Sequence, residues 1–350
     1  MQPLRLAVDA RVIAEDTRGI GRYARAVLRR LVVRDDVALT LLTDQPFPRR
    51  RRGAYARVLR SAAFEVKARA AGSLDLIWHP ANGTFFSSGL PSVATIHDAV
   101  PFRYPDADPK RRAHAQDPFL RSVRGASQII AVSQFGKGEL HELLAIPLDR
   151  MEVIEHGVDE SFTPGATDLL PAALRGKRFL LFVGDPTAEP RKNFAMLYEA
   201  YRRAWPSNDG PALAVAGARA PELPGVVHAG NFTDDLSGVA NESLRACYRG
   251  ALALTLASYH ETFGMPMLEA MACGTPVVAS RASCLPEIAG DAALYAPPDD
   301  AAAWATALRR IVEDDALREP LRLRGLARAK QFTWERSVLR HLAVFRSVAR

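Results

Sequence analysis

Short apolar segments alternate with longer amphipathic segments throughout this 350-residue chain. Residues 4–8, 92–96 and 179–183 are examples, and most of their side chains are apolar. Strands that are apolar on both faces are typical of parallel sheets, which helices cover on both sides. Regular alternation of such strands with helices predicts the α/β class. Since the alternation runs through both halves of the chain, we expect two doubly wound parallel sheets.

The length of the chain and one loop-like stretch indicate where the two sheets separate. A chain of 350 residues corresponds to roughly two domains, and a hydrophobic fraction of 48% is sufficient for two cores. Residues 163–178 carry two prolines and two glycines, which predicts a linker. We therefore predict an N-terminal domain at residues 1–165 and a C-terminal domain at residues 175–334.

The net charge of +7 bears on the partners of the protein rather than on its fold. No zinc-ligand spacing, recognition helix or aromatic–basic interleaving accompanies the charge, so we expect no nucleic acid partner. An anionic membrane surface or an anionic small substrate fits better. The three cysteines, Cys247, Cys273 and Cys284, lack metal-ligand spacing, and their odd number argues against a disulfide framework. No signal-peptide pattern and no apolar run of about 18 residues is visible, so the cytoplasm is the expected compartment.

Residues 258–280 combine a predicted loop, helix, glycine turn and apolar strand in one short stretch. Gly264 frees the backbone before the helix, and Pro266 suits the first helical position because no N–H is needed there. The backbone N–H groups of Phe263, Gly264 and Met265 therefore lie at a helix start. Such a start favours an anion.

Two carboxylates flank this helix start. A glutamate early in a helix complements the positive end of the helix dipole by about 0.3–1 kcal/mol without any ligand. That interaction accounts for Glu269 but leaves Glu261 unexplained. A carboxylate beside an anion site is better suited to sugar hydroxyls than to the anion itself. The order of these residues resembles the Glu-x7-Glu signature of the GT-B retaining glycosyltransferases of family 4.

A second motif follows the first strand of the C-terminal half. Strand 179–183 closes on Gly184, and Arg191 and Lys192 come shortly afterwards, near the start of a predicted helix. The helix dipole disfavours cations at that position, so a bound anion best explains two adjacent cations. The run Glu-Pro-Arg-Lys-Asn that contains them resembles the diphosphate grip of family 4. The chain departs from the family pattern by having Asp185 directly after Gly184, which leaves the role to Arg191 and Lys192.

The N-terminal half carries two weaker motifs. Strand 4–8 leads to a loop with Gly19 and Gly21 and then to a helix, which is the phosphate-binding start of a doubly wound unit. An ordinary turn explains a lone Gly-x-Gly equally well. His97 follows strand 92–96 directly, and open sheets bind ligands at the carboxyl ends of their strands. The runs Gly-Ile-Gly-Arg-Tyr and Thr-Ile-His-Asp resemble the donor loop and the active-site histidine segment of family 4.

For the fold, the resemblance implies a GT-B architecture, in which two Rossmann-like domains face each other across a cleft. The C-terminal domain binds the donor nucleotide in such enzymes. The last helix, here residues 335–350, packs back on the N-terminal domain.

For the site, the resemblance assigns roles to individual residues. Arg191 and Lys192 stabilise the leaving diphosphate, since oriented charges act where charge develops. Glu261 holds hydroxyls of the donor sugar, and Glu269 binds the ribose. Phe232 is a candidate for contact with the nucleobase. Residues 263–265 also contact the donor, whereas His97 and the loop with Gly19 and Gly21 contribute from the N-terminal domain.

The activity implied is transfer of a hexose from a GDP- or UDP-linked sugar, with retention at the anomeric carbon. No cofactor and no metal are expected, because cations and helix N-termini can neutralise the diphosphate. Mannose from GDP-mannose is one candidate. The expected acceptor is a glycan or a lipid-linked saccharide of cell-surface polysaccharide synthesis.

Alternative functions stay open at this point. The chain could be another GT-B enzyme, such as a sugar-nucleotide epimerase or a phosphorylase, or could transfer to a small-molecule acceptor. A dinucleotide oxidoreductase is disfavoured, because no Gly-x-Gly-x-x-Gly with a spaced acidic residue follows the first strand.

Two further patterns carry less weight. The basic segment at residues 49–69 begins with four arginines, and its apolar spacing predicts a helix over residues 54–70. A solvated helix face and a membrane-facing basic patch are equally good interpretations, so a peripheral position on the inner face of the membrane is an alternative to the cytoplasm. Asp106 and Asp108 form an Asp-x-Asp triplet, a metal–diphosphate motif of another architecture. The triplet lies in a proline-rich turn, so we predict no metal role for it.

Overall fold

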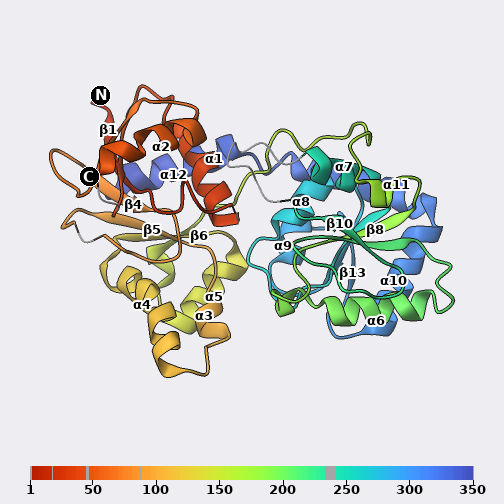
Figure 1. Cartoon of the computed structure of the whole chain (residues 1–350). Coiled ribbons are helices and arrows are strands. Elements are labelled where there is room, and N and C mark those ends of the chain that lie inside the picture. Colours follow the sequence, from red (N-terminus) through yellow and green to blue (C-terminus); the bar gives the residue numbers. More distant parts are fainter. Residues whose placement is uncertain (1, 18, 45–46, 87, 233–241, 350) are drawn as a thin grey trace. The chain divides into compact units, whose positions relative to one another are not determined.

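The computed structural model describes residues 2–17, 19–44, 47–86, 88–232 and 242–349. They form two compact units (Figure 1). Unit 1 contains the described residues of 2–157 and 334–349, and unit 2 contains those of 158–333. The chain changes unit after Gly157. The stretch at 163–178 that we predicted as a linker lies in unit 2, where Leu174 is fully buried.

The sheet of unit 1 has seven parallel strands in the order β3-β2-β1-β4-β5-β6-β7. The strands are β1 (Leu4–Asp9), β2 (Val37–Leu42), β3 (Phe64–Lys67), β4 (Leu76–His79), β5 (Ser92–Ile96), β6 (Gln128–Ala131) and β7 (Met151–Val153). The chain builds the sheet outward from β1 to β3 and then continues from β4 on the other side of β1. This reversal is the point at which doubly wound sheets bind ligands.

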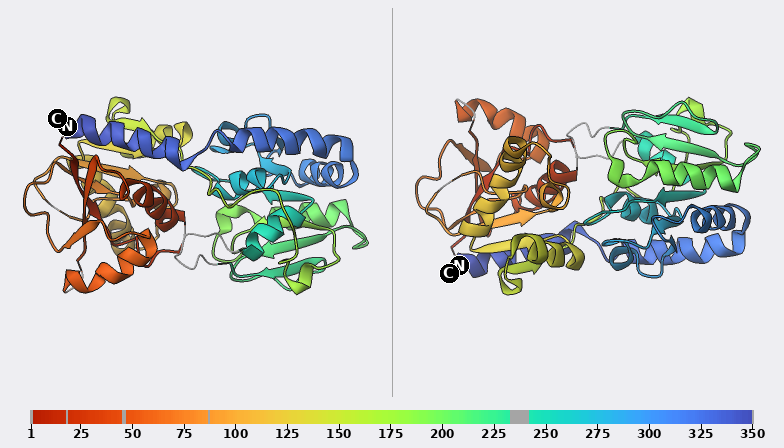
Figure 2. Two further views of the ribbon diagram at one scale, coloured as in Figure 1. Left: turned by 90° about the horizontal axis from the view of Figure 1, so that it is seen from above. Right: turned by 90° about the horizontal axis from the view of Figure 1, so that it is seen from below.

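Helices cover both faces of this sheet. They are α1 (Gly19–Leu31), α2 (Arg52–Leu59), α3 (Val100–Arg103), α4 (Pro109–Gly125), α5 (Gln134–Leu144) and α12 (Trp334–Val348), with short 3₁₀ turns η1 (Pro48–Arg51) and η2 (Leu148–Arg150). In Figure 1, α1, α2 and α12 lie above the sheet, and α3, α4 and α5 lie below it. The last helix, α12, contacts α1 and β5 and thus belongs to unit 1, although it follows unit 2 in sequence (Figure 2).

The helix predicted over residues 54–70 is wrong. The structure has the short helix α2, and residues 64–67 form the edge strand β3, which pairs with β2. Arg60 ends the helix in a left-handed conformation with φ +56°. The apolar residues Phe64 and Val66 then follow the two-residue period of a strand, which the sheet edge stabilises through backbone hydrogen bonds.

The glycines Gly19 and Gly21 do not lie in a loop as predicted, because both belong to the first turn of α1. Gly21 is buried against the preceding segment. A Cβ atom at this position would lie 1.9 Å from the backbone oxygen of Asp16. The glycine is therefore required for close packing of the backbone.

The sheet of unit 2 has six parallel strands in the order β10-β9-β8-β11-β12-β13. The strands are β8 (Phe179–Val183), β9 (Ala212–Ala216), β10 (Val226–Gly230), β11 (Ala253–Leu256), β12 (Val277–Ser280) and β13 (Ala293–Ala296). The direction of strand addition reverses between β8 and β11. Unit 2 therefore has its own topological switch point, equivalent to that between β1 and β4.

The helices of unit 2 also lie on both faces. They are η3 (Ala172–Leu174), η4 (Pro190–Lys192), α6 (Phe194–Ala204), α7 (Glu242–Gly250), α8 (Met265–Ala272), α9 (Leu285–Ala289), α10 (Ala301–Glu313) and α11 (Asp315–Ala329). Helix α6 packs against α10, and α8 packs against α11 and α7. The core includes the fully buried Trp304, and Phe182 contacts Phe194 edge to face at 5.0 Å. Both halves thus form the α/β sheets that the alternating pattern predicted.

Candidate active site

Three of the predicted site residues meet at the switch point of unit 2. Arg191 and Lys192 follow β8 in the 3₁₀ turn η4, and Glu261 follows β11. Because β8 and β11 are parallel neighbours, the segments after them lie at the same edge of the sheet. The backbone joins the two segments directly, since the N–H of Tyr259 donates to the carbonyl of Arg191 at 2.9 Å.

The turn after β8 brings the two cations back over the end of that strand. Gly184 has φ +144°, and a Cβ atom there would lie 2.6 Å from Cδ of Lys192. The carboxylate of Asp185 accepts hydrogen bonds from the N–H groups of Thr187 and Ala188, both at 2.9 Å. These bonds lower the pKa of Asp185. Asp185 therefore stabilises the turn through its side chain. This structural role explains why an acidic residue directly follows Gly184.

Glu189 holds both cations and was not singled out in the sequence. Its Oε1 lies 3.2 Å from Nη2 of Arg191, and its Oε2 lies 3.4 Å from Nζ of Lys192. Lys192 is 8% exposed and also donates to the carbonyl of Val183 at 3.0 Å. The two positive charges are thus fixed by a carboxylate and by the end of β8.

Glu261 contacts the same arginine from the other side. Its Oε2 lies 3.3 Å from Nη1 of Arg191, and its Oε1 accepts a hydrogen bond from Oγ of Ser258 at 3.0 Å. The backbone N–H of Glu261 donates to Oγ of Ser283, also at 3.0 Å. The carboxylate of Glu261 is 13% exposed and Arg191 is 34% exposed, so a ligand can reach both.

Glu269 lies beyond the first turn of α8 and is 2% exposed. The helix-dipole interpretation is therefore insufficient, because that effect is confined to the first turn. The hydroxyl of Tyr248, on α7, donates to Oε2 of Glu269 at 2.8 Å. This partner was not predicted, since it lies on another helix.

The start of α8 presents its backbone rather than its side chains. Gly264 has φ +78° and makes no side-chain cap, and a Cβ atom there would lie 2.9 Å from Cδ2 of Leu285. Phe263 is buried and packs edge to face on Phe332 at 6.0 Å. Among residues 263–265, the side chain of Met265 is half-buried, and donor contact by this segment stays a prediction.

Phe232 follows β10 and is half-buried. Its ring lies over Gly230, where a Cβ atom would come within 3.2 Å of the ring. The contact with the nucleobase stays a prediction for this residue.

His97 and the two N-terminal glycines belong to unit 1. His97 is 6% exposed, its backbone N–H donates to Oδ1 of Asn82 at 2.6 Å, and its Nε2 lies 2.9 Å from the carbonyl of Pro80. Burial lowers the pKa of His97, opposed by the bond to Pro80 and by Asp98. The ring is therefore neutral near pH 7.

Asp108 stabilises the start of a helix in unit 1. Its side chain caps the start of α4, where Oδ1 accepts the N–H of Lys110 at 2.8 Å and that of Arg111 at 3.4 Å. Among the described residues, no three His, Cys, Asp or Glu side chains lie close enough together to hold a metal ion.

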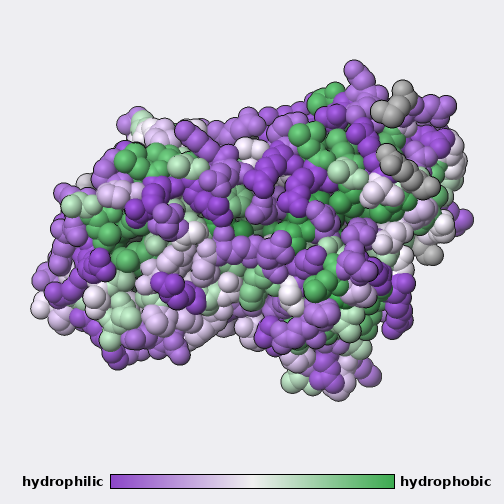
Figure 3. All heavy atoms as spheres, turned by 180° about the vertical axis from the view of Figure 1, so that it is seen from behind, coloured by the Kyte–Doolittle hydropathy of each residue, from purple (hydrophilic) through white to green (hydrophobic). Residues whose placement is uncertain are grey.

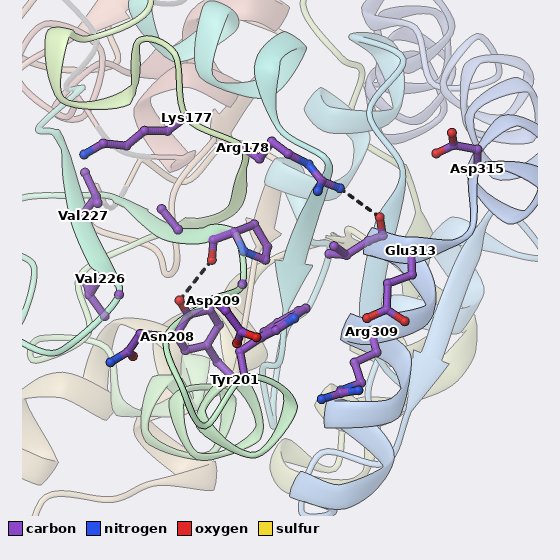
Figure 4. Close-up of a pocket in the computed structure, with 16 residues that line it drawn as sticks. Lys177, Arg178, Tyr201, Asn208, Asp209, Val226, Val227, Arg309, Glu313 and Asp315 are labelled. Atoms are coloured by element: carbon purple, nitrogen blue, oxygen red, sulfur yellow. Dashed lines mark hydrogen bonds between the residues drawn. The ribbon is translucent and has the colours of Figure 1, made fainter.

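A wide cavity of about 1040 Å³ lies elsewhere in unit 2. It is lined by residues at the starts of β8, β9 and β10, including Arg178 and Val226, and by Arg309 and Glu313 of α10 (Figure 4). Arg178 donates to the carbonyl of Val312 across one side of it. The cavity is thus at the amino ends of the strands, opposite the edge with Arg191 and Glu261, and parallel sheets bind ligands at the carboxyl ends.

The face shown in Figure 3 is largely hydrophilic, with hydrophobic residues in separate patches. Within the described residues, every helix is too short or too polar to cross a bilayer.

Comparison with known proteins places these motifs in a family. Residues 9–162 match the family described as Glycosyltransferase Family 4, and residues 177–314 match the one described as Glycosyl transferases group 1. The chain is 34% identical to O-antigen chain mannosyltransferase B from Escherichia coli over 280 residues, which cover 75% of this chain and 71% of that protein. It is 30% identical to a D-inositol 3-phosphate glycosyltransferase from Salinispora arenicola over 345 residues, which cover 87% and 75% of the two chains.

Solved structures show the same fold. Sucrose-phosphate synthase from Thermosynechococcus elongatus aligns with a TM-score of 0.71 at 19% identity, covering 99% of both chains. Anabaena Alr3699/HepE in complex with UDP-glucose aligns with a TM-score of 0.68 at 17% identity, covering 98% of this chain and 99% of that one. These neighbours confirm the predicted GT-B architecture of two Rossmann-like units. The chain belongs to glycosyltransferase family 4 and is a glycosyltransferase with the GT-B fold.

Proposed function

We propose that this enzyme transfers a hexose from a nucleoside diphosphate without a metal ion and with retention of anomeric configuration. The observation that carries the proposal is the pair Arg191 and Lys192, which Glu189 holds at the carboxyl end of β8. A leaving diphosphate gains negative charge in the transition state, and preorganised cations stabilise such charge. The uncapped start of α8 adds backbone N–H groups at the same edge.

The position of Glu261 supports retention by a route other than double displacement. In double displacement, as in retaining glycosidases, a carboxylate nucleophile works with an acid partner about 5 Å away. Glu261 is instead engaged by Arg191 and Ser258, an arrangement suited to binding sugar hydroxyls. We propose that the departing phosphate accepts the proton of the acceptor hydroxyl on the same face of the sugar.

The proposed donor is GDP-mannose and the proposed acceptor is a glycan or lipid-linked saccharide of cell-surface polysaccharide synthesis. The similarity to O-antigen chain mannosyltransferase B of Escherichia coli supports both. A small-molecule acceptor is the second candidate, because a D-inositol 3-phosphate glycosyltransferase covers more of the chain at 30% identity. A UDP-linked donor is the alternative for the nucleotide, since Alr3699/HepE was solved with UDP-glucose.

The central test measures turnover of purified enzyme with GDP-mannose or UDP-glucose and a panel of lipid-linked saccharide and inositol phosphate acceptors. Arg191→Ala and Lys192→Ala should lower turnover at least a hundredfold, whereas EDTA should leave the parent unchanged. Arg203→Ala is a matched control, because Arg203 forms an exposed ion pair with Glu199 on α6. The product should show the retained configuration by NMR.

Two results would overturn the chemistry. Loss of activity in EDTA with rescue by Mg²⁺ or Mn²⁺ would contradict metal independence, and an inverted product would contradict retention. Epimerisation without an acceptor, or phosphate-dependent cleavage of a glycan, would instead support the epimerase or phosphorylase alternatives. His97→Ala tests the prediction that His97 is catalytic. Full activity of this variant would contradict that prediction.

We also propose that unit 1 associates with an anionic membrane surface. Arg49, Arg50, Lys67 and Arg69 line one hollow with Phe47, whose side chain is 66% exposed. The guanidinium of Arg50 lies 4.7 Å from the centre of the Phe47 ring. Basic residues near an anionic surface contribute about 1 kcal/mol each, and an exposed aromatic ring favours the interface.

Vesicle sedimentation tests this association at low and high salt. The parent should bind vesicles that contain anionic lipid and release them at high salt, because the attraction is screened. The double variant Arg49→Glu/Arg50→Glu should bind more weakly, whereas Arg203→Glu should bind like the parent. Equal sedimentation of the parent with neutral and anionic vesicles would remove the proposal.

A further inference from the structure

Glu261 is held in place by a set of groups that leaves it beside Arg191. Ser258 Oγ donates to Oε1, Nη1 of Arg191 lies 3.3 Å from Oε2, and Ser283 accepts the backbone N–H. Ser283 takes a left-handed conformation with φ +52°, which is rare for a residue other than glycine, asparagine or aspartate. Ser258 is itself fixed, since Oγ of Ser280 donates to its carbonyl at 2.5 Å.

Two cations and two carboxylates form one ion-pair network at this edge of the sheet. Arg191 and Lys192 are matched by the carboxylates Glu189 and Glu261, and Arg191 contacts both carboxylates. Glu189 binds the two cations together and therefore organises them. Glu261 contacts only Arg191 among the described cations within ion-pair distance, so its carboxylate opposes any second anion that approaches that guanidinium.

We propose that Glu261 is a specificity-determining residue, which makes the site favour a nucleoside diphosphate carrying a hexose over the bare nucleoside diphosphate. This inference rests on the proposed function, in which Arg191 binds the diphosphate. It adds that the carboxylate of Glu261 makes the site bind the sugar nucleotide more tightly than the nucleoside diphosphate product.

The selection follows from competition at the guanidinium. Either ligand brings a diphosphate that competes with Glu261 for Nη1 of Arg191 and is repelled by the carboxylate. Only the donor also brings hydroxyls of a hexose, which can donate hydrogen bonds to Glu261, and hydrogen bonds to charged groups are the stronger ones. The bare diphosphate has in addition a terminal phosphate that ionises near pH 6, so it carries more charge and is repelled more.

A consequence of this arrangement is easier release of the product. Once the hexose has left, Glu261 loses its hydroxyl partners and keeps only the repulsion. The ion pair between Glu261 and Arg191 can then form again at the expense of the diphosphate. Release of product limits turnover in many enzymes, so the carboxylate would favour the forward cycle.

The test is calorimetric titration of the parent, Glu261→Gln and Glu319→Gln with GDP, UDP, GDP-mannose and UDP-glucose. Glu319 is a matched control, because it is an exposed carboxylate paired with Arg322 at 2.7 Å in the same unit. Glu261→Gln should bind the bare diphosphate about tenfold more tightly, the factor that about 1.4 kcal/mol represents. It should bind the corresponding sugar nucleotide no more tightly than the parent, and Glu319→Gln should match the parent throughout.

Ser258→Ala gives an independent readout of positioning. This change leaves both charges in place and removes one hydrogen bond to Oε1 of Glu261. The variant should lose several-fold in affinity for the sugar nucleotide and should keep the parent affinity for GDP or UDP. A merely structural role would weaken both ligands alike.

Two outcomes separate this inference from the proposed function. If Arg191→Ala weakens GDP or UDP binding but Glu261→Gln leaves the ratio of donor to diphosphate affinity unchanged, the inference is wrong and the proposed diphosphate role stands. If Arg191→Ala binds both ligands like the parent, the proposed role of Arg191 is wrong as well.

Discussion

Acid should destabilise unit 1 through His341, a fully buried histidine of α12. Its Nδ1 lies 2.7 Å from the carbonyl of Ser337, and its Nε2 lies 2.5 Å from the hydroxyl of Tyr23. Because a carbonyl only accepts, Nδ1 carries the proton and Nε2 accepts from Tyr23. The Thr95 hydroxyl then donates to Tyr23 at 3.0 Å and accepts from Nε1 of Trp78 at 3.0 Å. Protonation of Nε2 would make the Tyr23 hydroxyl an acceptor toward His341 and would leave one hydroxyl proton of this chain without its present partner.

The pKa of His341 gives the size of the effect. Burial lowers it from 6.5 to about 4, partly opposed by the bond to Ser337. The neutral ring therefore stabilises the folded state fully above pH 6.5, and this contribution is lost as the pH falls toward 4. At about 1.36 kcal/mol per pH unit, the difference corresponds to at most about 3.4 kcal/mol. The same linkage relation gives about 2 kcal/mol between pH 8 and pH 5.

Urea unfolding at pH 8 and pH 5 measures this contribution, with amide exchange in α1 and α12 as the probe of unit 1. His341→Gln should lose about 2 kcal/mol less stability between the two pH values than the parent does. Burial also lowers the pKa of His97 and His156, so some acid sensitivity should remain. His114→Gln, a change at an exposed histidine of α4, should behave like the parent. An equal loss of stability in the parent and His341→Gln would refute the reasoning.

Three shorter predictions concern other residues. Tyr248→Phe removes the bond to the buried Glu269; it should cost about 1.5–3 kcal/mol in chemical denaturation and should weaken the preference for GDP over 2′,3′-dideoxy-GDP. Gly184→Ala should displace Lys192, since the added Cβ would lie 2.6 Å from its Cδ, and turnover should fall at least tenfold. Asp108→Ala should cost about 1 kcal/mol of stability through loss of the α4 cap and should leave turnover and its response to EDTA unchanged.

The sequence predicted the sheets well because strand and helix periods are local properties. It failed at residues 54–70, where the apolar spacing of α2 continues past the helix end. What ends that helix is the left-handed Arg60, and what forms β3 is the free edge of β2. The pairing of β3 with β2 is a contact between segments that lie apart in the sequence. The periodicity of side chains within one segment gives no information about such a contact.

The site was predictable to the extent that its residues lie in short motifs. Arg191, Lys192 and Glu261 lie together in the structure as those motifs suggested. Ser283 could not be found this way, because it lies 22 residues after Glu261 and acts through an unusual backbone conformation. Glu189 is the first residue of the run Glu-Pro-Arg-Lys-Asn. Its acidic side chain, close in sequence to two cations, was the signal that could have identified it.

The proton on His97 restricts what this residue can contribute to catalysis. Its Nε2 lies 2.9 Å from the carbonyl of Pro80, so in the neutral ring Nε2 donates and Nδ1 is left as an acceptor. A neutral acceptor nitrogen suits a substrate hydroxyl and cannot supply positive charge to a diphosphate. We therefore expect that His97, if it is catalytic, binds a hydroxyl.

A pH profile tests this assignment. Because burial keeps the pKa of His97 below 6.5, kcat should be insensitive to this group between pH 6.5 and pH 8 and should fall only under more acidic conditions. His97→Asn, which can place an amide oxygen near the position of Nδ1, should retain more kcat than His97→Ala and should leave the affinity for GDP or UDP unchanged. A weaker affinity of both variants for the bare diphosphate, or a kcat that rises on acidification below pH 6.5, would show that the ring acts as a cation.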